Sequence, residues 1–211
     1  MPFTRSLPGS VLQVLADQIA ERTSSPEPLE SFITAPDTNA ESVPSSRLTE
    51  SFVIWNLIPD VSEELESGER NLSLLARNSG VWHHQIRQDG QATAFARSKP
   101  LGPDPEDWSL REVVESPLAQ RIDEGIAFAD HEVPPEVEVR LLSISFQQVE
   151  AFWFVTAPGS EHEATWNDRI LVLSAPARLQ QLVTKQIITA REFLDALSTP
   201  VRGIGLIPGD R

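Results

Sequence analysis

The pair Asp89-Gly90 stands within residues 81–97, between two runs of strand-forming residues. Asp-Gly suits a two-residue β-hairpin turn, because both central positions of that turn require positive φ. Such a turn places His84 opposite Phe95. Successive strand residues point to opposite faces, so His83 and His84 are expected on different faces. The segment therefore predicts an antiparallel hairpin, and with it a fold that contains a sheet.

Four further segments have the length and apolar pattern of strands: 52–58, 139–146, 149–156 and 169–174. Helices are indicated by capping-box spacings and by apolar residues at positions i, i+4 and i+8. These signals predict helices that begin near Ser10, Ser109, Ser116 and Thr189. The order of helices and strands favours the α+β class, with a mostly antiparallel sheet and helices packed on it.

The N-terminal part of the chain differs from the rest in composition. Residues 1–22 are expected to form a helical arm with an apolar stripe. Residues 23–51 are rich in Pro, Ser and Glu, and too few of them are apolar to offset the entropy of ordering, so a disordered linker is expected. Residues 52–211 are expected to form a single α+β domain. The first helix either folds back on this domain or docks on a partner, and the sequence does not choose between the two.

Charge and composition exclude several classes of function. The chain of 211 residues has a formal net charge of −14 and contains no cysteine. Duplex nucleic acid repels such a chain, so it is not an expected partner. Disulfides, thiolate catalysis and cysteine-ligated metal sites are excluded. No apolar run has the length of a membrane span or of a signal peptide, which leads us to expect a cytoplasmic protein.

Candidate catalytic side chains are few. No Walker loop, Gly-x-Ser-x-Gly elbow or His-Glu-x-x-His motif occurs. An enzyme built on a His/carboxylate pair would use His83 or His84 with Asp107 or Glu115. Packing in or near the core is the alternative role of both histidines.

Two segments that flank a histidine with acids are candidate metal ligands, and they are Asp130-His131-Glu132 and Glu161-His162-Glu163. Nothing in the sequence fixes the distance between them, and solvated loops are their alternative reading. We therefore expect no metal and no cofactor.

Two apolar segments are the candidate protein-binding surfaces. One is the stripe of the first helix and the other is the strand at 149–156, and the residues concerned are Leu12, Leu15, Ile19, Phe152, Trp153 and Phe154. Burial in the core is the alternative for the strand. Basic residues gather around the hairpin, where an anion-binding patch would consist of Arg87, Arg97 and Lys99.

Five blocks of the chain resemble a set of uncharacterised proteins from cyanobacterial genomes. The blocks are Val81–Ile86, Ala94–Ser98, Leu101–Trp108, Glu115–Ala119 and Glu150–Trp153. Residues 1–51 lie outside the resemblance. It implies a bacterial cytosolic origin and carries no mechanism.

The sequence thus favours a non-enzymatic adaptor or regulatory protein that binds another protein in the bacterial cytosol. A small hydrolase or ligand-binding enzyme with a His/carboxylate site is the first alternative. A module that binds anions at the basic hairpin is the second. Whether the chain forms a homo-oligomer stays open.

Overall fold

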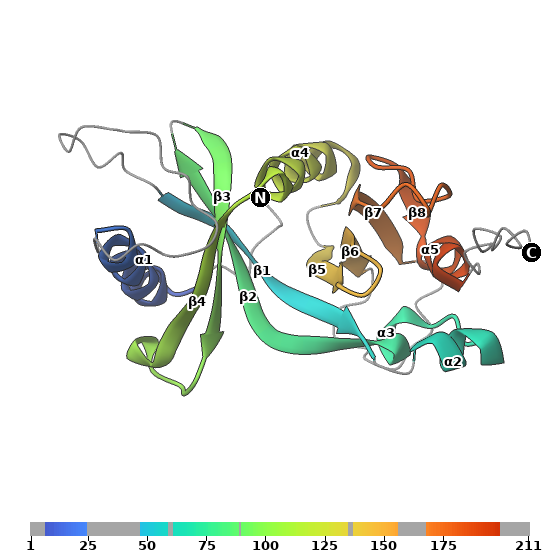
Figure 1. Cartoon of the computed structure of the whole chain (residues 1–211), viewed down its shortest axis with the longest axis horizontal. Coiled ribbons are helices and arrows are strands. Elements are labelled where there is room, and N and C mark those ends of the chain that lie inside the picture. Colours follow the sequence, from blue (N-terminus) through green and yellow to red (C-terminus); the bar gives the residue numbers. More distant parts are fainter. Residues whose placement is uncertain are drawn as a thin grey trace, which may run out of the picture.

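The computed structural model describes residues 7–24, 47–58, 61–88, 90–134, 137–155 and 168–198. These residues form eight strands in one sheet, ordered β4-β3-β2-β1-β5-β6-β7-β8 (Figure 1). Neighbouring strands are antiparallel, except that β1 pairs with β5 in parallel. The expected α+β class, with a mostly antiparallel sheet preceded by a helix, is confirmed.

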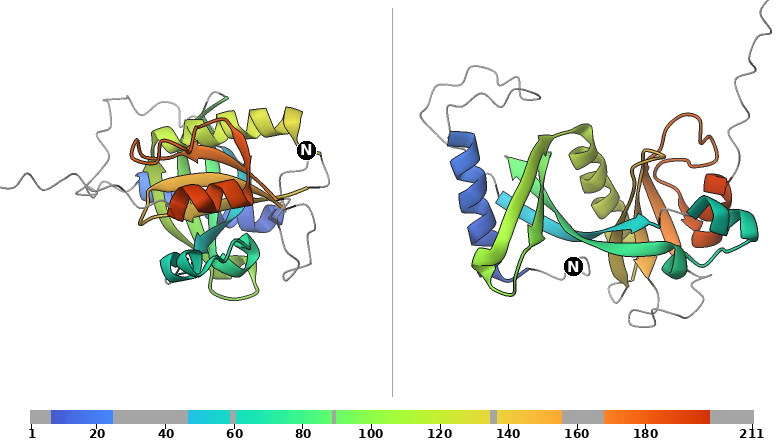
Figure 2. Two further views of the ribbon diagram at one scale, coloured as in Figure 1. Left: turned by 90° about the vertical axis from the view of Figure 1, so that its right-hand side faces the viewer. Right: turned by 60° about the horizontal axis from the view of Figure 1, so that its bottom comes forward.

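The two longest strands connect the two ends of the sheet. The strands are β1 (Arg47–Leu57), β2 (Ala76–Gln88), β3 (Gln91–Pro100), β4 (Trp108–Glu115), β5 (Glu138–Ile144), β6 (Val149–Val155), β7 (Arg169–Ser174) and β8 (Ile187–Thr189). The helices are α1 (Gly9–Ser24), α2 (Val61–Ser67), α3 (Leu72–Leu75), α4 (Pro117–Glu132) and α5 (Ala190–Ser198), and a 3-10 turn, η1 (Pro105–Asp107), precedes β4. Strands β1 and β2 run between one end, formed with β3 and β4, and the other end, formed by β5 to β8 (Figure 2).

Helix α4 crosses one face of the sheet and contacts both β3 and β7. Ser116 caps its N-terminus by accepting the backbone N–H of Leu118, and Pro117 occupies the first helical turn, so the start expected at Ser116 is confirmed. Gly125 permits a close approach of the helix to the sheet. A Cβ atom at this position would lie 2.4 Å from Cδ2 of Leu173.

The opposite face of the β5–β7 end is covered by α2, α3 and α5. Alternation along β6 directs Phe152 and Phe154 toward the α4 side and Trp153 into the second core. Helix α5 begins with the expected capping box, because the Thr189 hydroxyl accepts the N–H of Glu192 while the Glu192 carboxylate accepts the N–H of Thr189. Each face of this end therefore has its own apolar core.

Two sequence predictions are wrong. The segment after Ser109 is strand β4 and not a helix, because it pairs with β3 and buries Trp108 and Leu110, which outweighs a local cap spacing. The hairpin register is shifted by one residue, since an irregularity follows the Ile86 pair and places His84 opposite Ala96.

The boundaries of the N-terminal segments also differ from the expectation. Helix α1 continues to Ser24 and strand β1 begins at Arg47, so both ends of the linker expected at 23–51 are helix or strand. Residues 25–46 lie outside the described residues. Helix α3 and the edge strand β8 were not predicted from the sequence. Within the described ranges, no helix is both long and apolar enough to cross a membrane.

Candidate functional site

His84 is buried on the face of the sheet that α1 covers. Its Nδ1 atom lies 2.9 Å from the Ser51 hydroxyl, and its Nε2 atom lies 2.7 Å from the Ser98 hydroxyl. Burial lowers the pKa of His84 to about 4. The imidazole is therefore neutral near pH 7 and joins β1, β2 and β3 through two hydroxyl groups.

His83 is buried on the opposite face, where its ring stacks on Phe95 with 4.7 Å between the ring centroids. The Gln85 side-chain amide nitrogen donates to the Ala119 carbonyl, so its oxygen, Oε1, is the acceptor that faces Nε2 of His83 at 3.2 Å. This arrangement assigns the proton of the neutral imidazole to Nε2. Burial lowers the pKa of His83 to about 3; the Gln85 hydrogen bond opposes part of this shift, and the nearby charge of Arg97 lowers the pKa by a smaller amount.

The candidate acids do not join either histidine. The Asp107 carboxylate lies in η1, where it accepts the backbone N–H of Asp104, and Glu115 is exposed at the end of β4. Across the residues that the structure describes, the two imidazoles form hydrogen bonds only with serine hydroxyls and with Gln85. His83 and His84 thus lie apart from Asp107 and Glu115, and both are packed in the core.

A candidate metal site is also missing from the described residues, where no group of three or more His, Asp or Glu side chains could hold an ion. His131 is exposed in the last turn of α4. Residues 161–163, which include His162, lie outside the described residues.

The cations of the hairpin are distributed among acidic partners. Arg87 pairs with Asp123 and, at 3.3 Å, with Glu50. Arg97 pairs with Glu112 at 3.0 Å, and its guanidinium lies 5.2 Å from the centre of the Phe95 ring. Lys99 is exposed near the end of β3. Since both arginines are already paired, the structure does not gather these three cations into one open patch.

The three aromatic residues of β6 lie in the core. Phe152 and Trp153 have no exposed surface, and Phe154 is 2% exposed. The Trp153 indole N–H donates to the Asp168 carboxylate at 2.7 Å, and the Arg140 guanidinium lies 4.7 Å from the ring. These residues are positioned to stabilise the sheet, which is the alternative that the sequence left open for this strand.

Helix α1 folds back on its own chain. Val11, Leu15 and Ile19 are buried, and Leu12 lies partly buried at the margin. They pack on what we call the α1-binding surface, which consists of Ile86, Ala94, Ala96, Trp108 and Leu110.

Polar side chains of α1 complete this contact by pairing with the free edge of β4. The Gln18 amide nitrogen donates to the Trp108 carbonyl, and its oxygen accepts the N–H of Leu110, both at 2.8 Å. Arg22 donates to the carbonyl oxygens of Leu110 and Arg111. One glutamine side chain therefore makes the donor–acceptor pair that a residue of a neighbouring strand would make.

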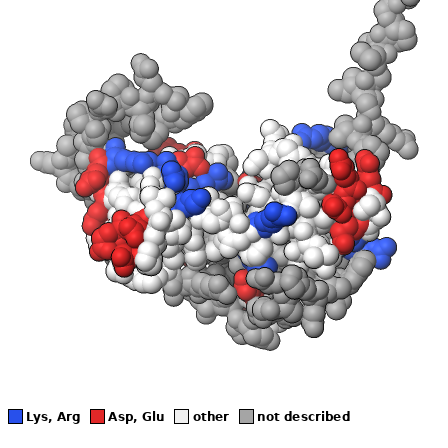
Figure 3. All heavy atoms as spheres, turned by 90° about the horizontal axis from the view of Figure 1, so that it is seen from below, with Lys and Arg blue, Asp and Glu red and all other residues white. Residues whose placement is uncertain are grey.

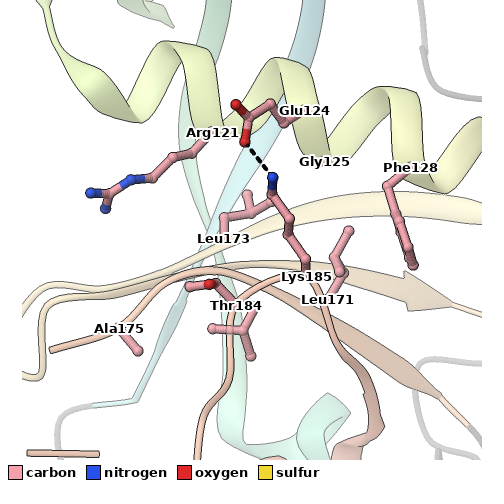
Figure 4. Close-up of a pocket in the computed structure, with 10 residues that line it drawn as sticks. Arg121, Glu124, Gly125, Phe128, Leu171, Leu173, Ala175, Thr184 and Lys185 are labelled. Carbon is pink, nitrogen blue, oxygen red and sulfur yellow. Dashed lines mark ion pairs between the residues drawn. The ribbon is translucent and has the colours of Figure 1, made fainter. Parts of the chain in front are cut away.

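A pocket of about 250 Å³ lies between α4, β7 and the loop that follows β7. We call it the α4–β7 pocket. Figure 4 shows Leu171 and Leu173 below α4 and Phe128 hanging from the helix on one side. Lys185 reaches across the opening, where its Nζ atom lies 3.0 Å from the Glu124 carboxylate.

Sequence reasoning missed both Gln18 and Lys185. The polar positions of an amphipathic helix are expected to face solvent, and nothing local indicates that Gln18 meets a strand edge 90 residues away. Lys185 follows an irregular segment without periodicity. The pairing of β7 with β8 and the hydrogen bond from the Lys185 N–H to the Val172 carbonyl bring its loop over α4.

Comparison of the chain with protein-family models, with curated proteins and with solved structures gave no match in any of the three. The site must therefore be interpreted from its own geometry.

Proposed function

We propose that this chain is a non-enzymatic adaptor or regulatory protein that binds an amphipathic helix of another protein on the α1-binding surface. In the free protein α1 occupies this surface, and a partner helix takes its place. The observation that carries the proposal is the Gln18 contact, in which a helix side chain satisfies a strand edge that the sheet leaves open. The cytoplasmic setting expected from the sequence is part of the same proposal.

The α1-binding surface has the chemistry of a helix-binding groove. It receives apolar side chains at positions i, i+4 and i+8, which is the spacing by which amphipathic helices are recognised. The α1 helix has 16 residues, a length at which an isolated helix is marginally stable in water. Its fold therefore depends on this contact, and a partner helix with the same spacing competes with α1, which has the advantage of a high effective concentration because it belongs to the same chain.

The connection to the rest of the chain permits such an exchange. Twenty-two residues, 25–46, separate the end of α1 from the start of β1. A segment of this length spans up to ~75 Å when fully extended. Covalent attachment therefore does not hold α1 against β4; the side-chain contacts do.

Charge indicates the nature of the partner. The chain has a net charge of −14. Acidic side chains gather in patches at both ends of the face that Figure 3 shows. A partner helix with basic residues on its polar face would be attracted to such a protein, with faster association at low salt.

The test is affinity capture from native cytosol with the full-length chain and three variants. Leu15→Asp places a charge in the buried stripe and should release α1, so it should capture more of a specific partner than the unmodified chain does. Gln13→Asp adds the same charge on the exposed side of α1 and is the matched control. Adding Ala96→Trp to Leu15→Asp fills the surface and should abolish the gain. Equal capture by all four proteins would refute the proposal.

A further inference from the structure

The α4–β7 pocket combines an apolar floor with a charged rim. Leu171 and Leu173 are buried beneath it, and Phe128 of α4 forms one wall (Figure 4). Its volume of about 250 Å³ lies just below the range of about 300–1,000 Å³ that is usual for ligand pockets. It therefore suits a ligand smaller than a drug-sized molecule.

Lys185 occupies a backbone conformation that lysine rarely adopts. Its φ angle is +63°, in the left-handed region, and its N–H donates to the Val172 carbonyl at 3.0 Å. Glycine or asparagine adopts this conformation at lower cost. Strained residues of this kind cluster at ligand clamps, where the side chain has a role that offsets the strain.

The ion pair of Lys185 with Glu124 is too weak to offset the backbone strain at Lys185. The Lys185 side chain is 66% exposed and that of Glu124 is 41% exposed. An exposed pair of this kind contributes little to stability, because water and salt screen it. The side chain of Lys185 is thus held over the pocket by a pair that a competing anion can open.

The charges around the pocket favour an anion. Lys185 and Arg121 are two cations against the single carboxylate of Glu124. Arg121 extends along α4 away from the ion pair, and its guanidinium donates to the Ser174 hydroxyl at 2.7 Å. In a chain with a net charge of −14, this local excess of positive charge is unusual.

We propose that the α4–β7 pocket binds a small amphipathic carboxylate, whose carboxylate group takes the place of Glu124 on Lys185 and whose apolar tail lies on Leu171, Leu173 and Phe128. The charge-assisted hydrogen bond to Lys185 fixes the head of the ligand. Burial of the tail supplies the remaining affinity. This site is separate from the α1-binding surface and does not depend on the function proposed above.

Isothermal titration calorimetry with octanoate on the full-length chain tests this inference, with octylammonium as the probe of opposite charge. For a ligand of about ten non-hydrogen atoms we expect a dissociation constant of order 0.1–1 mM for octanoate. Octylammonium should bind at least about tenfold more weakly, because the two cations at the rim outnumber the single carboxylate of Glu124.

Three variants assign the binding to this pocket. Lys185→Gln should weaken octanoate binding about tenfold. Lys99→Gln changes the other lysine of the chain, which is exposed on β3, and should leave the binding unchanged. Glu124→Gln should strengthen octanoate binding about threefold, because Lys185 then has no internal competitor.

Two results would overturn the inference. One is the absence of saturable octanoate binding up to about ten times the expected dissociation constant. The other is an equal response of the Lys185→Gln and Lys99→Gln proteins, which would place any binding elsewhere on the chain.

Discussion

The substitution Leu15→Ala should open α1 without unfolding the sheet. Leu15 has no exposed surface, and it packs on the α1-binding surface. Truncating a fully buried leucine costs about 2–5 kcal/mol. Because α1 faces solvent on its other side, part of the site can relax, and we expect a loss of about 2–4 kcal/mol in the free energy of α1 docking. The open population then rises about 30- to 700-fold, at about 1.4 kcal/mol for each factor of ten.

Hydrogen exchange measured by NMR reports this opening at a single amide. The N–H of Leu110 donates to the Gln18 side chain and is protected only while α1 is docked. The N–H of Ala190, which donates to the Asp168 carbonyl at the far end of the sheet, is the internal control. In the Leu15→Ala protein, the exchange rate of the Leu110 amide should rise by the same factor as the open population, and that of the Ala190 amide should not change.

Gln13→Ala removes only a surface contact with Asp17 and is the matched control. Equal acceleration at Leu110 and Ala190 would show that α1 opens only when the whole domain unfolds. That result would refute the reasoning that α1 is an exchangeable element.

Three further predictions follow from the core and from the pocket. The pKa values of His83 and His84 are lowered to about 3 and about 4 from 6.5, so the unfolded state binds more protons below pH 6.5 and stability is lost as the pH falls. At pH 5 each imidazole should cost about 2 kcal/mol, which urea unfolding at pH 7 and pH 5 measures. Gly125→Ala should lower the free energy of unfolding by about 0.5–2 kcal/mol, because the added Cβ meets Leu173, although alanine has the better helix propensity. Adding Leu173→Ala to Gly125→Ala should show a favourable coupling in a double-mutant cycle. Lys185→Gly should leave the melting temperature unchanged or slightly raised, and it should weaken octanoate binding about tenfold, as Lys185→Gln does. A clear loss of stability would mean that the lysine has a structural role.

The sequence predicts the elements of this fold better than their pairing. Signals within one element were sufficient for the start of α4 at Ser116, for the capping box of α5 and for the limits of β7, because caps and alternation are local. The hairpin register was not predictable, since the irregularity near Ala92–Ala94 depends on packing against both faces. Strand β4 was mistaken for a helix because Ser109 and Glu112 have cap spacing by chance, whereas its pairing with β3 is a tertiary effect.

The candidate site, like the strand pairing, depends on contacts that local sequence signals do not predict. The apolar stripe at Leu15 and Ile19 was visible in the sequence, but its location on β2, β3 and β4 was not. The contacts that matter most for the proposals join residues far apart in the chain, such as Gln18 with Leu110 and Lys185 with Glu124. No periodicity within a single segment reports such pairs.

The proposed adaptor function requires that the α1-binding surface accept a helix from outside the chain. Fluorescence anisotropy of a labelled peptide with the sequence of residues 7–24 tests it directly, by titration with the full-length chain and with its Leu15→Asp variant. We expect saturable binding to the Leu15→Asp protein, much weaker binding to the unmodified chain whose own α1 competes, and no binding of a peptide that itself carries Leu15→Asp. Failure of the peptide to bind the Leu15→Asp protein, or equal binding to both proteins, would contradict it.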